Sequence, residues 1–265
     1  MAARPETRLY IDGDLAEGGT LGLDHSRAHF LRSVLRLSRG ARLAVFNGRD
    51  GEWLARLDGL GKGWASLVVE RKLRDQEGAP DLWLVFAPIK RARLDFLVEK
   101  ATELGVARLQ PVMTRHTVVG RVNRERLAAN AREAAEQCER LDLPEVRDPL
   151  DLFALLADWP AERRLLLCAE GGPARPLAEV LSEAAEDAAG HPASRTGPWA
   201  VLTGPEGGFA ASELDALVKL PFVTPVGLGP RVLRADTAAL AALACWQAIL
   251  GDGAGRPPRR RSEQH

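Results

Sequence analysis

The chain has 265 residues, of which 46% are hydrophobic, so it can bury a core without disulfides or metal ions. Its 36 Lys and Arg residues balance 36 Asp and Glu residues, which argues against a histone-like or polybasic protein. The amino terminus lacks the apolar segment of a secretory signal, and no apolar run of about eighteen residues predicts a membrane span. Three widely spaced cysteines fit neither a zinc site nor a disulfide framework, and they predict a cytoplasmic protein without a metal.

The charges are distributed unevenly along the chain. Residues 1–140 contain 24 basic and 19 acidic side chains, whereas residues 141–255 contain 8 basic and 16 acidic ones. Arg residues far outnumber Lys residues, which suits phosphate recognition but would also follow from a GC-rich genome. The basic first half is therefore the part that we expect to meet a polyanion.

Short strands broken by glycine turns are predicted in the first 74 residues. The alternation of apolar residues marks strands at 42–46, 52–57 and 64–69, a spacing typical of a small β-barrel. A helix over 29–36 interrupts them. Its Arg32 and Arg36 stand four apart and would share a face, either as a phosphate-facing pair or as two solvated side chains. A polar linker follows at 74–80.

From residue 81 the pattern changes to alternating strands and helices. Apolar runs predict strands at 82–87, 107–113, 164–168, 199–202 and 222–226. Helices are predicted from Leu94 to a glycine cap at Gly105, and at 124–140, 176–186, 211–217 and 237–250. This order predicts an α/β domain with a mostly parallel sheet. We expect domains at 1–74 and 80–251, followed by a disordered basic tail at 252–265.

Two glycine-rich loops carry the strongest signals for chemistry. The first, 202–209, runs Leu-Thr-Gly-Pro-Glu-Gly-Gly-Phe from a strand towards a helix that Ser212 and Glu213 open. Its glycines would let a ligand approach the backbone, although a tight strand-to-helix turn would need them as well. The loop lacks the Lys-Ser/Thr of a phosphate-binding Walker loop and the spacing of a dinucleotide fingerprint.

The second loop, 226–238, also leads from a strand end into a helix. Arg231 and Arg234 stand beside its glycines, where arginines commonly meet anions, and Asp236 or Thr237 would serve as a plain helix cap. Because both loops follow strands of one predicted sheet, they would lie at the edge where α/β folds bind ligands.

These motifs resemble the bacterial 16S rRNA (uracil-N3)-methyltransferase family of the SPOUT superfamily. The resemblance rests on Gly-Pro-Glu-Gly-Gly-Phe at 204–209 and Leu-Gly-Pro-Arg-Val-Leu-Arg-Ala-Asp-Thr-Ala at 228–238. It continues upstream in Lys90 with Lys100 and Glu103-Leu104-Gly105, in 133–140, in 29–36 and in Phe46-Asn47-Gly48, and so spans residues 8 to 250. The chain departs from the family's usual residues at Asp236 (Glu), Cys138 (Ser) and Thr203 (aliphatic).

The resemblance implies a fold, a cofactor and partners. It implies a carboxyl-terminal SPOUT domain with a deep trefoil knot, an amino-terminal PUA-like β-barrel that binds RNA, and a homodimer. It further implies S-adenosylmethionine as cofactor and 16S rRNA of the small ribosomal subunit as substrate. Methyl transfer from a sulfonium needs no metal, but uracil N3 must lose its proton or be strongly polarised.

Site residues follow from the same resemblance. Arg234 would stabilise negative charge on the base, and Glu206 would act as a base or shape its loop. The expected cofactor-binding residues are Cys168, Ala169, Leu202, Thr203, Gly204, Gly207, Gly208, Val226, Gly227, Leu228, Gly229, Arg231 and Leu233, with a third wall near Glu170-Gly171-Gly172. The expected phosphate contacts are Arg32, Arg36, Lys90, Arg91, Arg115 and Arg132. His116 would shuttle a proton or take a surface or packing role.

Two rival hypotheses remain open at the level of the sequence. One is a SPOUT methyltransferase that acts on tRNA or on a 2′-hydroxyl. The other is a non-catalytic RNA-binding factor in ribosome assembly. Lys100, Glu103, Glu136 and Arg140 could also form an ion-pair network between helices instead of a functional group.

Overall fold

The computed structural model describes residues 5–169, 174–187 and 197–257. The chain forms two compact units. Unit 1 comprises Met1–Gly78 with Ala135–Leu143, and unit 2 comprises Ala79–Ala134 with Pro144–His265. Among the described residues, no helix has the length and apolar character needed to cross a membrane.

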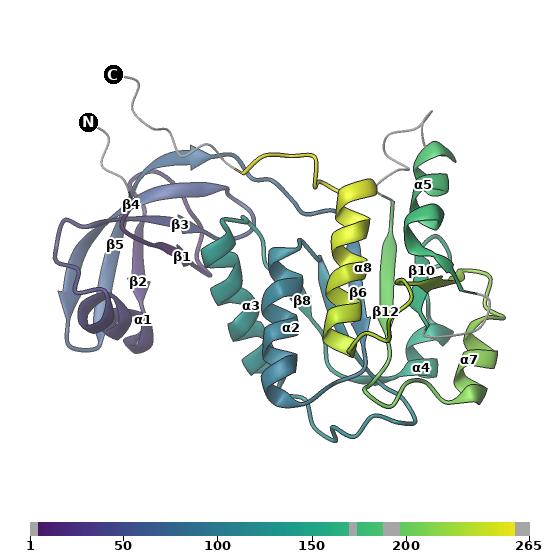
Figure 1. The fold of residues 1–265 in the computed structure, drawn as a ribbon. Helices are drawn as coiled ribbons and strands as arrows, with labels where there is room; N and C mark the ends of the chain where they lie inside the picture. The colour runs from purple at the N-terminus through teal and green to yellow at the C-terminus, as the bar shows by residue number, and fades with distance from the viewer. Residues whose placement is uncertain (1–4, 170–173, 188–196, 258–265) are drawn as a thin grey trace. The chain divides into compact units, whose positions relative to one another are not determined.

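Unit 1 is built around a five-stranded sheet (Figure 1). Its strands are β1 (Arg8–Tyr10), β2 (Thr20–Leu23), β3 (Arg42–Phe46), β4 (Glu52–Gly61) and β5 (Trp64–Arg74), in the order β1-β3-β4-β5-β2. β1 is parallel to β3, and the other pairs are antiparallel. Alternate apolar side chains of the strands fill the core, which confirms the predicted period of two. The pairing path runs from β1 to β2, so closure into a barrel stays a prediction.

The predicted helix over 29–36 is wrong at both ends. The helix α1 (His25–His29) begins four residues earlier, because the Asp24 side chain accepts the Arg27 N–H at 2.9 Å. It continues as the π-helical turn η1 (Phe30–Val34), and Arg36 then adopts a left-handed conformation with φ of 56°. Arg32 and Arg36 therefore do not share a helical face.

The end of helix α3 (Arg124–Cys138) and the residues after it belong to unit 1, although the sequence placed them in the second domain. The Arg8 guanidinium donates to the carbonyl oxygens of Ala135 and Arg140, both at 2.8 Å. The Arg74 guanidinium donates to the Glu139 carbonyl at 2.7 Å. These contacts join residues far apart in sequence, which no local pattern predicts.

Unit 2 contains an all-parallel sheet in the order β11-β13-β10-β12-β6-β7-β8. The strands are β6 (Leu82–Phe86), β7 (Arg108–Met113), β8 (Glu145–Val146), β10 (Arg164–Cys168), β11 (Arg175–Pro176), β12 (Trp199–Thr203) and β13 (Val223–Gly227), and β9 (Leu150–Asp151) pairs with β7. The helices are α2 (Arg91–Glu103), α4 (Leu152–Ala157), α5 (Leu177–Asp187), α7 (Ala211–Leu217) and α8 (Ala235–Ile249), with the first part of α3.

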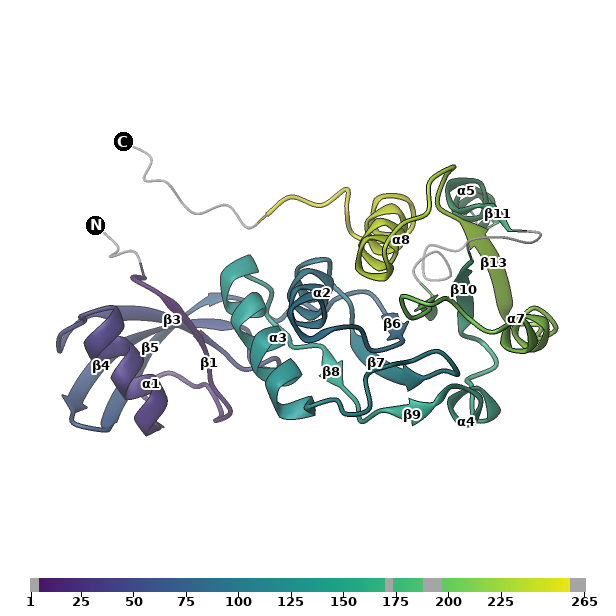
Figure 2. The same cartoon turned by 60° about the horizontal axis from the view of Figure 1, so that its bottom comes forward.

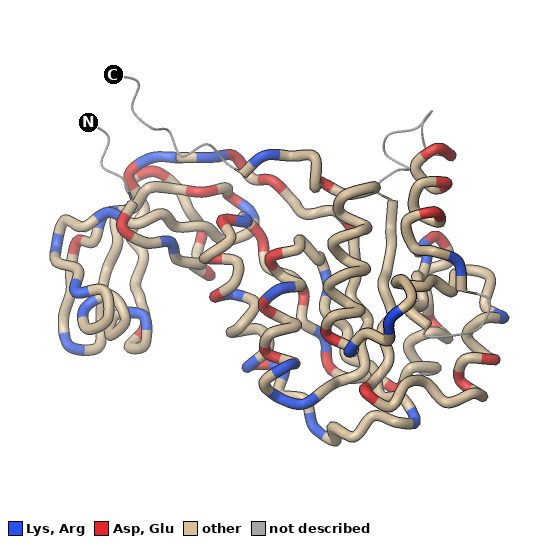
Figure 3. The backbone as a smooth tube through the Cα atoms, in the orientation of Figure 1, with Lys and Arg blue, Asp and Glu red and all other residues tan. Residues whose placement is uncertain are grey.

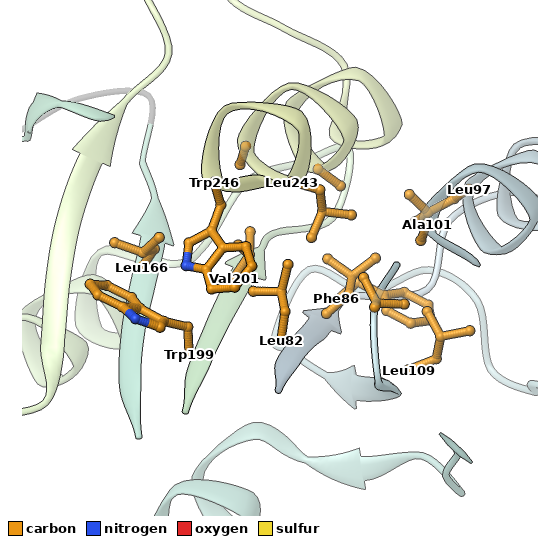
Figure 4. Packing of buried hydrophobic residues seen from close by; sticks show 14 of the residues in the cluster. Leu82, Phe86, Leu97, Ala101, Leu109, Leu166, Trp199, Val201, Leu243 and Trp246 are labelled. Carbon is orange, nitrogen blue, oxygen red and sulfur yellow. The ribbon is translucent and has the colours of Figure 1, made fainter. Parts of the chain in front are cut away.

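Helices cover both faces of this sheet (Figure 2). One face packs against α2, α3, α5 and α8, and the other packs against α4 and α7. Leu82, Leu84 and Phe86 of β6 point to the first face, whereas Trp83 and Val85 point to the second. Both faces are buried, which explains why the strand sequences are continuously apolar. Figure 4 shows the first core, where Trp246 and Leu243 of α8 lie over Val201, Leu82 and Phe86.

Helix ends agree with the sequence in one place and differ in another. Gly105 adopts a φ of 76° directly after α2, which confirms the predicted glycine cap. α8 begins at Ala235 with Arg234 at its N-cap position, so Asp236 and Thr237 lie in the first turn and neither is the cap.

The predicted tail is described in part. Residues 252–257 contain a turn in which the Gly255 N–H donates to the Asp252 carbonyl, while 258–265 lie outside the described residues.

Candidate active site at the carboxyl edge of the sheet

The register of unit 2 brings the two glycine loops to one edge of the sheet. Cys168 at the end of β10 pairs with Thr203 of β12 on one side and with Val226 of β13 on the other. Thr203 in turn pairs with Phe86 at the end of β6. Because these strands are parallel, the loops that follow β10, β12, β13 and β6 all leave from this edge. The predicted positions of the two loops are confirmed in this respect.

The strand ends form the floor of this edge. Leu202, Thr203 and Val226 are buried. The Thr203 carbonyl accepts the Ala87 N–H at 3.0 Å, and the Val226 carbonyl accepts the Ala169 N–H at 3.2 Å. Contact of these residues with a cofactor stays a prediction. The expected third wall, Glu170 to Gly172, lies outside the described residues.

Cys168 lies on this floor as a neutral thiol. Desolvation by burial raises the pKa of the Cys168 thiol to about 12. A thiol with such a pKa is protonated at neutral pH, and the thiolate is the reactive form. The partly buried Cys168 side chain packs against the first core of unit 2.

The loop after β12 is a compact turn with an exposed tip. The Phe209 ring lies against Gly204, where an added Cβ would stand 2.9 Å from Cε2 of the ring. Gly208 has a φ of 68° and donates its N–H to the Pro205 carbonyl at 2.9 Å, so the turn requires a glycine there. Glu206 is exposed at the tip. The glycines thus serve the turn, as the structural alternative predicted, and they leave the tip backbone open to a ligand.

Glu213 fixes this loop to a second one, a role that the sequence did not reveal. Its side chain is only 6% exposed and accepts two backbone N–H groups, from Ala210 and from Arg115, each at 2.8 Å. Ala210 precedes α7, whereas Arg115 follows β7. The position of Glu213 in the first turn of α7 suggested a helix start, but its partner 98 residues away leaves no local signal.

His116 contacts the same loop. Its Nδ1 lies 3.3 Å from the Gly207 carbonyl oxygen and 3.2 Å from that of Gly208. Both neighbours are carbonyl oxygens, which only accept, so these contacts are hydrogen bonds when Nδ1 carries a proton. The residue is exposed and holds the glycine loop, so it combines the predicted surface position with a loop contact.

The loop after β13 presents cations. Gly229 adopts a φ of 100°, which favours glycine, and Leu228 and Leu233 are half-buried. Arg231 and Arg234 are both exposed. Arg234 also occupies the N-cap position of α8, at the positive end of the helix dipole.

Asp236 is engaged in a structural ion pair. It is buried, its carboxylate lies 3.1 Å from the Arg93 guanidinium in the first turn of α2, and it accepts the Thr237 N–H at 3.0 Å. The shortened acidic side chain thus ties α8 to α2 below the arginine loop.

The expected phosphate contacts divide into three groups. Lys90 and Arg91 follow β6 and Arg115 follows β7, and all three are exposed at the carboxyl edge. Figure 3 shows Lys and Arg positions in blue along the lower edge of unit 2, where these loops lie. Arg132 is half-buried on α3, and Arg32 and Arg36 are exposed in unit 1.

Lys100, Glu136 and Arg140 of the upstream motifs have different partners, and Lys100 is not joined to the other two in one network between helices. Lys100 pairs with Glu99 and Glu103 within α2, and these carboxylates raise the pKa of Lys100. The Glu136 carboxylate accepts the Tyr10 N–H at 2.9 Å within unit 1. Arg140 pairs with Asp142 at 3.0 Å.

Two family models match the chain. The first is described as an RNA methyltransferase domain and covers residues 76–247. The second is described as an RNA methyltransferase PUA domain and covers residues 23–70.

Individual relatives match over nearly the full length. The chain is 32% identical to the ribosomal RNA small subunit methyltransferase E of Rickettsia conorii, over 89% of this chain and 93% of that one. It is also 32% identical to the Synechocystis protein of the same name, over 92% of this chain and 78% of that one. The crystal structure of a ribosomal RNA small subunit methyltransferase E from Neisseria gonorrhoeae bound to S-adenosyl methionine superposes with a TM-score of 0.80 at 26% identity, over 93% and 98% of the two chains. The chain therefore belongs to the RNA methyltransferase family and, within it, to the ribosomal RNA small subunit methyltransferase E family.

Proposed function

We propose that the protein transfers the methyl group of S-adenosylmethionine to N3 of a uridine in 16S rRNA of the small ribosomal subunit. The observation that carries the proposal is the strand register that joins both glycine loops at one edge, in a chain related over its length to ribosomal RNA small subunit methyltransferase E. The solved relative from Neisseria gonorrhoeae, which holds S-adenosyl methionine, supports the cofactor.

The residues at this edge fit that cofactor. Gly204, Gly207, Gly208, Gly227 and Gly229 offer backbone without side chains, and Leu228 and Leu233 offer apolar walls. When bound, S-adenosylmethionine supplies an electrophilic methyl group on a sulfonium. A thiolate nearby would compete with the RNA for that methyl group, so the neutral Cys168 thiol suits the site.

The arginine loop supplies the electrostatics of the proposed reaction. Uracil N3 gains negative charge as its proton leaves, and that charge spreads to the neighbouring carbonyl oxygens. We assign Arg234 to those oxygens, because its guanidinium is exposed at the N-cap of α8, where the helix dipole adds to its charge. Arg231 helps to hold the cofactor or the RNA. The loop after β12 takes its shape from Pro205, His116 and Glu213, so Glu206 at the tip is the proposed acceptor for the N3 proton.

RNA would approach along the basic carboxyl edge. Lys90, Arg91 and Arg115 are assigned to phosphates near the reacting base, and Arg132, Arg32 and Arg36 to phosphates further along the RNA. The match of residues 23–70 to a PUA domain of RNA methyltransferases supports RNA binding by unit 1. The target uridine must be unpaired or flipped out for N3 to be reached.

The family resemblance also supports finer proposals about the fold. We infer a SPOUT-type deep trefoil knot around the cofactor loops, closure of unit 1 into a PUA-like barrel, a first domain built on 1–74 and completed by 135–143, a SPOUT domain formed by the rest of 80–251, a cytoplasmic location and a homodimer. Helix α8 supports the dimer, because residues 237–250 contain no charged side chain and its outward Thr237, Ala244 and Ala248 are small. Such a face can pack closely against a second copy.

The deciding experiment is methyl transfer from labelled S-adenosylmethionine to small ribosomal subunits from a strain that lacks the activity, followed by nucleoside analysis. We expect label in N3-methyluridine. Label in another nucleoside, or in tRNA alone, would favour a different methyltransferase. No label, with no calorimetric heat on addition of S-adenosylmethionine, would favour a non-catalytic assembly factor.

A further inference from the structure

One tryptophan side chain in the β4–β5 hairpin of unit 1 is exposed to solvent. The chain has six tryptophans, all within the described residues, and Trp64 alone belongs to the exposed class, at 54%. Trp64 begins β5 directly after the turn that joins it to β4, and it pairs with Gly61 across the hairpin. Its exposure leaves the indole available to a binding partner.

Two glycines of β4 form a flat floor beneath the indole. A Cβ added at Gly59 would stand 2.6 Å from Cζ3 of Trp64 and 2.9 Å from Cη2, and one added at Gly61 would overlap Nε1 and Cε2. Gly59 and Gly61 are two residues apart in the strand, so both open onto the same face. The ring therefore lies flat on the strand backbone, with one face covered and the other free.

Exposed cations lie in the hairpin turn and on η1. Lys62 is exposed in the turn between Gly61 and Gly63. An added Cβ at Gly63 would stand 2.8 Å from Cδ2 of His25, so that imidazole borders the same turn. Arg32 is exposed on η1, which continues directly from the helix that His25 opens. In Figure 3, the end of unit 1 that carries α1 and the β4–β5 hairpin shows several Lys and Arg positions.

We propose that Trp64 is a stacking platform for one unpaired base of RNA, with Lys62 on a flanking phosphate. A flat, pre-positioned aromatic face beside positive charge is the arrangement that binds single-stranded nucleic acid without sequence preference. The exposed residues of η1 include Phe30 and Val34 as well as Arg32, so the choice of RNA over a protein partner rests on Lys62 in the turn before Trp64 and on the match of 23–70 to a PUA domain of RNA methyltransferases. The inference rests on the proposed function, because it assigns a subsite to the same RNA.

The test measures binding of a short single-stranded oligouridylate and of a duplex RNA to the full chain, without methyl transfer. Trp64→Ala should weaken binding of the single strand about tenfold, since one stacked base contributes that much or more. Trp64→Phe should restore most of the affinity, and binding of the duplex should change little. Phe153→Ala is the matched control, because Phe153 is an aromatic residue of α4 that is 40% exposed.

A second measurement keeps the proposal testable if Trp64→Ala folds poorly. Acrylamide should quench Trp64 in the wild-type protein, and the oligouridylate should protect it; Trp64→Phe should lack this protected component. Wild-type affinity in Trp64→Ala, or no protection in the wild type, overturns the proposal. So does a change of sedimentation in Trp64→Ala without a change in RNA binding, which would assign the platform to a protein partner. Methyl transfer at saturating subunits reports the proposed function separately.

Discussion

Removal of the Glu213 carboxylate offers a direct test of how the cofactor loop is held. Glu213→Ala would leave the N–H groups of Ala210 and Arg115 without their acceptor, in a place that is 6% exposed. Each buried N–H that loses its partner costs about 1–3 kcal/mol. Together the two predict that unit 2 loses about 2–6 kcal/mol of its free energy of unfolding. Glu213→Gln retains one acceptor oxygen and should lose about half as much.

The assay is urea unfolding followed by the fluorescence of the buried tryptophans of unit 2, together with calorimetry of S-adenosylmethionine binding. Two units can unfold separately, so the transition of unit 2 is the quantity to compare. Asp215→Ala is the matched control, because Asp215 is exposed on the same helix and should change stability by less than about 0.5 kcal/mol. The reasoning fails if Glu213→Ala matches Asp215→Ala in both stability and cofactor affinity.

Three further predictions concern other residues. Arg234→Ala should lower kcat about 100-fold with calorimetric cofactor binding intact, and wild-type turnover would refute its role at the base. Hydrogen bonds to a backbone N–H and a side-chain amide hold the pKa of Asp50 below its ordinary value of 3.8. The ionised Asp50 carboxylate therefore stabilises the folded state fully above pH 3.8, and this contribution is lost as the pH falls through the lower pKa of Asp50 in the folded protein. Asp50→Asn should remove this pH dependence from acid unfolding curves. Iodoacetamide at neutral pH should label the exposed Cys138 well before Cys168, as judged by mass spectrometry.

The sequence predicted elements whose cause is local. The apolar run at 82–86 predicts a strand because helices bury both faces of it, and Gly105 predicts a helix end because only glycine takes its φ readily. The same reasoning located both glycine loops, since each begins where an apolar strand stops. The two-residue strands β8, β9 and β11 are too short to show any period, so the sequence did not predict them.

The parts of the site that the sequence did not predict depend on partners far along the chain. Glu213 and His116 carry ordinary signals for a helix start and a surface histidine, and only the fold shows that both hold one glycine loop. Asp236 is similar: its pattern suggested a cap, but Arg93, which lies 143 residues away, engages it in an ion pair. Contacts between side chains that lie so far apart in the sequence do not produce a periodic pattern in it.

The bonds from Arg8 and Arg74 to the segment 135–143 set an order of events during synthesis. Arg8 bonds to a carbonyl 132 residues further on, and the small cluster around Phe46 includes Ala135 and Leu141. A nascent chain that has just emerged through residue 78 thus lacks part of the wall of its own first unit. The main core of unit 1 lies within residues 9–69, so such a chain can pack that core but lacks its partner segment until α3 has been translated and the start of unit 2 has left the ribosome. A fragment cut at the apparent linker would stop at that same incomplete stage.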